Sequence, residues 1–143
     1  MRDDSGITGY RVAIVTLDAH AAGPAARVEA RLARDFPGLT VSVHAAAEWA
    51  ENEAALADAK ASVATADIVI ANLLFIEEHI TAILPDLKAA RDRADAFVGM
   101  IADAQIVKLT RMGDLDMARP QSAAVRLLKK LRGSSKPSGA SGE

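Results

Sequence analysis

Three histidines and several nearby carboxylates are the side chains best suited to chemistry in this 143-residue sequence. His20 follows Asp18 by two positions, and His79 directly follows Glu77 and Glu78. Imidazole is the commonest metal ligand in proteins and exchanges protons near neutral pH. A neighbouring carboxylate can orient such a ring or share a metal with it. The pattern therefore raises two hypotheses, a metal site and a general acid–base pair.

The spacing of these residues limits both hypotheses. Consecutive helical residues point about 100° apart, so residues 77–79 cannot converge on one ligand. A site would need one of them to meet Asp18 or His20 from another strand, and His44 lies on a more distant strand. The alternative is a set of solvated loop residues and a helix N-terminus with favourable negative charge. We therefore assign no catalytic residue and no metal site, and keep His20 and His79 as metal candidates only.

Stretches rich in β-branched and apolar residues predict the strands that position these side chains. The predicted strands span residues 10–17, 39–44, 67–73 and 96–101. The third stretch is almost purely apolar, which is typical of a strand buried on both faces of a parallel sheet. Strands and helical patterns alternate, and this predicts an α/β fold. We expect a doubly wound, flavodoxin- or Rossmann-like parallel sheet of about four strands, in the order 2-1-3-4, with helices on both faces.

Ligands of such sheets bind beside the carboxyl ends of the strands, at the topological switch point. In the expected order this point lies between the first and third strands. The candidates for ligand or interface contact along this edge are Asp18, His20, Asn72, Glu77, Glu78, His79, Asp103 and Gln105. Any ligand is therefore expected between the first and third strands.

The expected helices follow from apolar spacing and from breaker residues. One begins at Gly23 and ends before residues 37–38, and a second includes Trp49 in a heptad pattern. A third helix contains Pro85, so we predict a kink or two abutting helices near residue 84. A short helix over residues 104–112, capped by Asp103 and closed by Gly113, follows the fourth strand. Residues 121–131 predict a last helix. Trp49 is expected to be a packing residue rather than a ligand contact.

These elements divide the chain into four segments. Residues 1–9 are expected to be a flexible N-terminus, residues 10–113 the α/β domain, and residues 114–133 a loop with the C-terminal helix. Residues 134–143 are rich in Pro, Gly and Ser and are expected to be a disordered linker. Lys108 and Arg111 are candidates for contact with a partner protein, although basic residues at a helix C-terminus would explain them equally.

Composition excludes several functional classes. The net charge of −2 gives no basic footprint for nucleic acid, and the absence of cysteine excludes disulfides and thiolate metal sites. We expect no membrane span, no signal peptide and a cytoplasmic location. The first strand lacks a G-x-G-x-x-G turn, and no phosphate-binding loop follows any strand. The strand exits lack the hydroxyl-rich and aromatic loops of a flavin site, and Asn72 stands where a phosphoacceptor aspartate would be expected.

Several stretches, taken in order, resemble the N-terminal domain of the magnesium chelatase H subunit, the large porphyrin-binding subunit. The related cobalt chelatase large subunit has a similar general plan. The matching stretches are residues 15–20 (VTLDAH), 43–46 (VHAA), 71–80 (ANLLFIEEHI), 107–113 (VKLTRMG), 116–117 (DM) and 127–133 (LLKKLRG). The resemblance covers nearly the whole chain from Tyr10, and it rests on the order and spacing of these stretches.

The resemblance implies that the chain is part of a longer subunit. That subunit binds protoporphyrin IX, into which Mg²⁺ is inserted in chlorophyll and bacteriochlorophyll biosynthesis. ATP is hydrolysed by two partner subunits, I and D, which fits the missing phosphate-binding loop. This domain would need no cofactor, and its role would be structural, porphyrin-access or partner-contacting. The alternative is a free-standing flavodoxin-like module that binds a small molecule or a metal.

Overall fold

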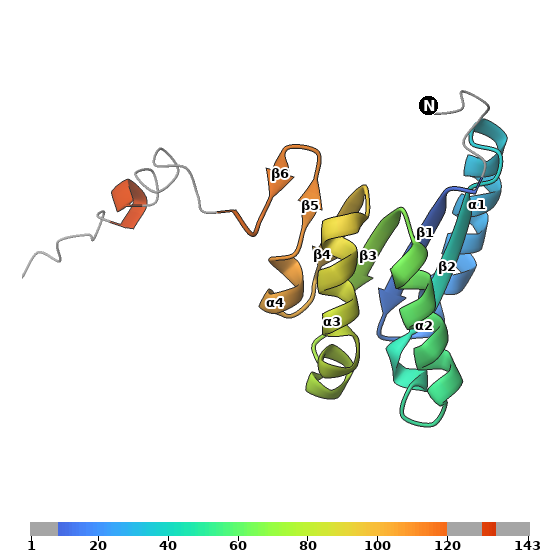
Figure 1. Ribbon diagram of the computed structural model, residues 1–143, viewed down its shortest axis with the longest axis horizontal. Helices are drawn as coiled ribbons and strands as arrows, with labels where there is room; N and C mark the ends of the chain where they lie inside the picture. Colours follow the sequence, from blue (N-terminus) through green and yellow to red (C-terminus); the bar gives the residue numbers. More distant parts are fainter. Residues whose placement is uncertain (1–8, 120–129, 134–143) are drawn as a thin grey trace, which may run out of the picture.

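The computed structural model describes residues 9–119 and 130–133, and it contains one mixed sheet. The strand order is β2-β1-β3-β4-β5-β6. The first four strands pair in parallel, and β5 and β6 add an antiparallel hairpin at one edge (Figure 1). The strands are β1 (Arg11–Thr16), β2 (Thr40–Ala45), β3 (Ile68–Asn72), β4 (Ala96–Met100), β5 (Arg111–Met112) and β6 (Leu115–Asp116). The predicted order 2-1-3-4 is confirmed.

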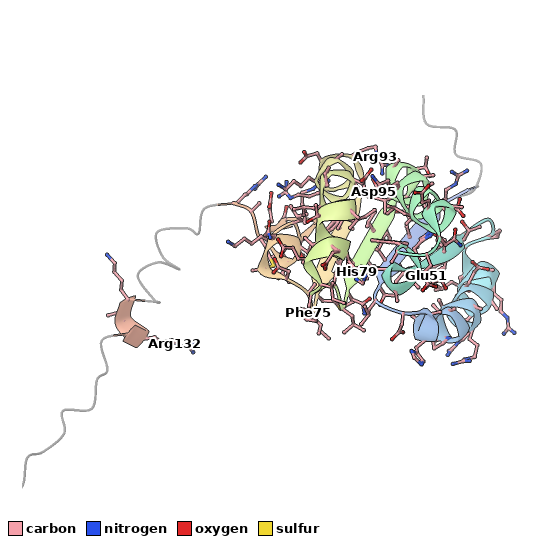
Figure 2. The ribbon with its side chains drawn as sticks, turned by 90° about the horizontal axis from the view of Figure 1, so that it is seen from below. Glu51, Phe75, His79, Arg93, Asp95 and Arg132 are labelled. Carbon is pink, nitrogen blue, oxygen red and sulfur yellow. The ribbon has the colours of Figure 1, made fainter. Side chains whose placement is uncertain are left out.

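The helices lie on both faces of the sheet, as predicted, but in unequal number. They are α1 (Ala22–Asp35), α2 (Glu53–Thr65), α3 (Glu77–Arg93) and α4 (Ala104–Val107), with short 3₁₀ turns η1 (Ala19–Ala21) and η2 (Ala46–Glu48). Figure 2, which looks along the sheet, shows α2 and α3 on one face and α1 alone on the other. This arrangement follows from right-handed crossovers, because β1 to β2 runs in one direction and the later connections run in the other.

The hydrophobic core lies between the sheet and the helices α2 and α3. We call this side of the sheet the α2–α3 face. Val15, Val69 and Phe97 point into the core from three neighbouring strands and are fully buried. Val63 of α2 and Ile83 of α3 pack against them and are also fully buried. Side chains alternate between the two faces of a strand, so every second strand residue enters this core.

The second helix begins later than the heptad pattern predicted. Asn52 accepts a hydrogen bond from the Ala55 backbone N–H at 3.2 Å, and so caps α2 at Glu53. Trp49 therefore precedes α2, directly after η2. Its expected role as a packing residue is confirmed, because its side chain is 6% exposed.

The third helix is a single element, so the prediction of two abutting helices is wrong. α3 runs through Pro85 without a break. Pro85 and Thr81, whose carbonyl loses its usual partner, are both exposed, and water can satisfy that carbonyl. The residues on the core side, Ile83 and Leu87, stay buried on either side of the proline.

The predicted helix over residues 104–112 is also wrong beyond its first turn. Asp103 does cap it, accepting from the Gln105 backbone N–H at 2.9 Å, but α4 ends at Val107. The chain then forms the β5–β6 hairpin, in which Gly113 has φ +57°. A positive φ at the first turn residue suits a two-residue hairpin loop, where glycine is favoured. Gly113 is thus a hairpin residue and not a helix cap.

Some expectations fall on residues outside the described ranges. These are the flexible N-terminus at residues 1–8, most of the last helix at residues 120–129, and the linker at residues 134–143. Residues 130–133 are described and are helical. Within the described ranges, no helix has the length and apolar character that crossing a membrane would require.

Candidate functional site

The carboxyl ends of β1, β3 and β4 form the edge where the sequence predicted a ligand. Asp18 and His20 come together there, because Asp18 caps η1 and accepts from the His20 backbone N–H at 2.9 Å. His20 Nδ1 also lies 2.7 Å from Asp18 Oδ1. The His20 side chain is 93% exposed, so this contact lies in solvent. The backbone and side-chain hydrogen bonds from His20 lower the pKa of the Asp18 carboxyl.

His79 lies in the first turn of α3 and contacts Trp49 instead of the Asp18–His20 pair. The two ring centroids are 6.0 Å apart, with the rings at 75° to each other. This is the edge-to-face geometry that aromatic rings prefer. The buried His79 Nδ1 and Trp49 Nε1 atoms have no hydrogen-bond partner. His79 is therefore positioned mainly by packing, and Glu77 and Glu78 beside it are exposed.

Asn72 ends β3, and its amide points to the opposite side of the sheet from the core. Ala71, the preceding residue, faces α2 and α3 and is fully buried. Strand alternation places the Asn72 side chain on the other face, where its Oδ1 is buried without a hydrogen-bond partner. The edge candidates are thus divided between the two faces of the sheet.

A hollow of about 640 Å³ lies between the N-terminal half of α3 and α4. Three of the predicted edge residues line it, namely Glu77, Asp103 and Gln105. The remaining lining residues are Phe75, Ile80, Thr81, Leu84 and Pro85. Carboxylate, amide and hydroxyl groups beside an apolar wall can hold a ligand that carries both hydrogen-bond donors and an apolar part. The sequence identified three polar residues of this hollow but neither Thr81 nor their shared location.

The loops after β3 and β4 are joined to each other at this edge. The Leu73 N–H donates to the Ile101 carbonyl at 2.8 Å, and the Asp103 N–H donates to the Leu74 carbonyl at 2.9 Å. Leu73 and Ile101 have φ of 55° and 48°, a left-handed conformation that costs a non-glycine residue about 1–2 kcal/mol. Phe75 and Ile101 are 58% and 66% exposed. The sequence did not predict this apolar rim: Ile101 fell at the end of a predicted strand, and Phe75 fell between the predicted third strand and the following helix.

The two basic candidates differ in their surroundings. Arg111 donates to the Arg91 carbonyl at 3.1 Å and to the Ala94 carbonyl at 2.7 Å, and so caps the end of α3. Lys108 is exposed. Of the two, only Lys108 keeps a side chain that a partner protein could reach without breaking these hydrogen bonds.

The candidate side chains at this edge make hydrogen bonds and packing contacts. In residues 9–119 and 130–133, no three His, Asp or Glu side chains are grouped closely enough to hold a metal ion. His79, the histidine of the third-strand exit, contacts a tryptophan and not a carboxylate. Of the two histidines near the first- and third-strand exits, His20 pairs with a carboxylate in solvent and His79 packs on an aromatic ring.

Together, the fold and this edge define a doubly wound α/β domain whose strand exits carry polar and exposed apolar side chains. The model of a family described as "Domain of unknown function (DUF3479)" matches residues 11–143. The chain belongs to this family.

Two relatives are far longer than this chain. It is 70% identical over 139 residues to the H subunit of the magnesium chelatase of Cereibacter sphaeroides, covering 97% of this chain and 12% of that protein. It is 65% identical over 135 residues to the H subunit of the magnesium chelatase of Rhodobacter capsulatus, covering 94% of this chain and 11% of that protein. The resemblance found in the sequence is confirmed, and the chain spans about one eighth of the length of these relatives.

Proposed function

We propose that this chain is the N-terminal domain of a magnesium chelatase H subunit. The complete protein would bind protoporphyrin IX for the ATP-dependent insertion of Mg²⁺ in chlorophyll or bacteriochlorophyll biosynthesis. The observation that carries the proposal is the 70% identity to the Cereibacter sphaeroides protein over 97% of this chain. Identity at that level, maintained from end to end, supports a shared place in a longer polypeptide of the same kind.

The role proposed for this domain is contact rather than catalysis. Its partners would be the rest of the H subunit and the I and D ATPase subunits, in the cytoplasm of a bacterium. Two observations support the role: the candidate edge residues are divided between two faces of the sheet, and the apolar rim around Phe75 and Ile101 is exposed. The edge candidates Asp18 and His20, together with the basic candidate Lys108, would then contribute to binding surfaces.

The alternative is a free-standing flavodoxin-like module that binds a small molecule. The hollow of about 640 Å³ beside α4 favours it, because polar and apolar groups meet there. In that case binding would depend on Asp103 and Gln105 and would need no further polypeptide. The two proposals therefore predict different requirements for the rest of the polypeptide.

A chimera separates the two proposals. The stretch of the Cereibacter sphaeroides protein that aligns with residues 11–133 of this chain is replaced by those residues. Mg²⁺ insertion into a soluble porphyrin is then measured with the I and D subunits and ATP. We expect activity close to that of the parent protein, because 70% identity preserves most contacts between this domain and its surroundings. A porphyrin titration of the same preparation reports whether the chimera is folded.

The matched control is the same parent protein with the stretch deleted. If the domain contributes to function, the deletion variant loses activity and the chimera restores it. A chimera that binds porphyrin normally but is as inactive as the deletion variant contradicts the proposal. Equal activity of all three proteins would also contradict it, since the domain would then be dispensable.

A further inference from the structure

The two faces of β3 and β4 are buried to different degrees. The residues that face α2 and α3, among them Val69, Ala71 and Phe97, are fully buried. The residues between them, such as Ile70 and Val98, are only partly buried, and Met100 at the end of β4 is 43% exposed. The second face of these strands therefore lacks the cover that the first face has.

Strand register extends this second face across the hairpin. Ile68 is in register with Ala96, Ile70 with Val98, and Asn72 with Met100. Ala96 is in register with Met112, and Met112 with Leu115. Residues in register point to the same side of a sheet. We call this set the open face: Ile68, Ile70, Asn72, Ala96, Val98, Met100, Met112 and Leu115. Met112 and Leu115 are 50% and 51% exposed.

The open face has the composition of an interior. No position in it carries a charge, and every position except Asn72 is apolar. A strand with one face in water alternates apolar residues with polar ones, whereas parallel strands that are apolar throughout are normally covered on both faces. A contiguous apolar patch on a protein surface marks an interaction site.

α1 covers only the neighbouring part of this side. It packs against β2, and even there it buries none of its own residues fully. Beneath it lies a hollow of about 360 Å³ lined by Tyr10, Val12, Leu32, Phe36, Leu39 and Ile68. Ile68 belongs to both this hollow and the open face, so the apolar surface is continuous from α1 to the hairpin. Figure 2 shows the same asymmetry, with α1 below only one side of the sheet.

From these observations we infer that the open face is the surface on which another part of the same longer polypeptide, beyond residue 143, docks through an apolar surface of its own. This inference rests on the proposed function, because it takes the rest of the H subunit as the partner. The chain covers 12% of its Cereibacter sphaeroides relative, so most of such a protein lies outside it.

Chain connectivity favours this partner over a separate protein. β6 forms the outer edge of the open face, to which it contributes Leu115. The described chain leaves β6 at Met117–Arg119 (Figure 1). The polypeptide that follows is therefore tethered next to the open face, which raises its effective concentration there. The open face also lacks the charges that steer separate proteins together, and apolar composition is typical of permanent interfaces.

A different occupant is the nearer segment at residues 121–131, in which Leu127, Leu128 and Leu131 form the apolar side of the predicted helix. A second copy of the chain is another occupant. Both are included as outcomes of the experiment.

Methionine oxidation tests the inference in the full-length chimera described above. Met100 and Met112 of the open face serve as probes, because exposure controls the rate at which peroxide converts methionine to its sulfoxide. Mass spectrometry measures both rates in the folded chimera and in the chimera unfolded by denaturant. We expect oxidation to be about tenfold slower in the folded chimera. Rates within about twofold of the unfolded protein would overturn the inference.

Two further measurements identify the occupant. Changing Leu127, Leu128 and Leu131 to serine in the chimera should leave the methionines protected. If they become reactive, the segment at residues 121–131 covers the open face and the inference is overturned. Protection should also be independent of protein concentration; protection lost on dilution would assign the face to a second copy.

A charged variant gives a readout that does not depend on methionine. Met112→Asp should increase the rate of proteolytic cleavage between this domain and the rest of the chimera about tenfold, because docking would bury the new carboxylate. Ala89→Asp, which adds the same group at an exposed position of α3, should leave the rate unchanged. Equal rates for the two variants would count against docking.

Chelatase activity of the same preparations separates this inference from the proposed function. An active chimera whose Met100 and Met112 oxidise freely overturns the docking inference alone. An inactive, folded chimera in which both residues are protected overturns the proposed function alone.

Discussion

The two faces of the sheet differ in what covers them, although the strands supply apolar residues to both. On the α2–α3 face, Val69 and Phe97 are fully enclosed by helices of this chain. On the open face, Val98 is half-buried and Met112 is 50% exposed. Apolar side chains on a strand therefore show that a face is meant to be covered, but not which polypeptide covers it.

Because of this difference, residues on the two faces contribute to different free energies, that of folding and that of docking. A fully buried residue contributes its burial free energy within the described domain. A half-exposed apolar residue has buried only part of its apolar area in the domain. The free energy of burying the rest is gained only when a second surface covers it. Substitutions at neighbouring positions of one strand can therefore separate folding of the domain from docking of the domain.

The largest expected effect comes from the two adjacent residues Phe97 and Val98. Phe97→Ala should lower the free energy of unfolding of the 143-residue chain by about 3–5 kcal/mol, because it leaves a cavity in the core. Val98→Ala should lower it by about 1 kcal/mol or less, because the open face is already partly solvated. Urea titrations followed by the fluorescence of Trp49, the single tryptophan, measure both. Equal losses would mean that the two faces are covered alike in this chain.

A smaller effect is expected at Gly99, next to these residues on the α2–α3 face. A β-carbon there would lie 2.5 Å from the Ile106 carbonyl oxygen, which belongs to the backbone of α4. Gly99→Ala should therefore lower the free energy of unfolding by about 1–3 kcal/mol, because α4 must shift. Gly23→Ala is the matched control, since its nearest atom would be an Arg27 side-chain nitrogen at 3.7 Å within α1. That control should be neutral or slightly stabilising.

The next effect concerns the two basic candidates near the hairpin. Arg111→Ala removes two hydrogen bonds to the last carbonyls of α3 and should cost about 1–2 kcal/mol in unfolding free energy. Lys108→Ala should stay within about 0.5 kcal/mol, as expected for an exposed side chain. The same urea titration measures both. If Lys108→Ala were as destabilising as Arg111→Ala, Lys108 would have to be part of the folded structure rather than available to a partner.

The sequence predicted the parallel sheet because its strongest signals are local. The apolar run at residues 67–73 and the alternation of strands and helices are sufficient to give the order 2-1-3-4. The β5–β6 hairpin was missed because its strands have two residues each. A signal was present, since Gly113 and Asp114 form a glycine–aspartate pair of the kind that favours two-residue hairpin loops.

The contacts within the site were harder to predict because they depend on packing between distant segments. A site shared with the third-strand exit would have needed Asp18 or His20 to reach across to it, but Asp18 contacts His20 within its own loop. The contact between His79 and Trp49 has no local signal, since 30 positions of sequence separate the rings. Asn72 lies on the opposite face from Ala71, and the sequence does not show which of the two faces is covered by α2 and α3.

The smallest expected effect is a loss of stability at acid pH. It arises from His44, which lies on the α2–α3 face. His44 is in register with Val15, and α2 desolvates its ring, which lowers the pKa of His44 below 6.5. The nearby Asp58 opposes this effect only in part. The unfolded chain therefore takes up a proton at His44 as the pH falls below about 6.5, whereas the folded chain takes it up only at a lower pH. The free energy of unfolding should then decrease from pH 7.5 to pH 5.5, and His44→Gln should reduce this decrease.

Ser42→Ala is the control, because the hydroxyl of Ser42 lies 3.1 Å from His44 Nε2 and its removal leaves the desolvation by α2 in place. This variant should keep the decrease in stability between pH 7.5 and pH 5.5. An NMR titration of His44 measures the pKa directly, and urea titrations at each pH measure the stability. A pKa of His44 above 6.5 would contradict the burial of this side of β2 by α2. It would then also count against the contrast between the α2–α3 face and the open face.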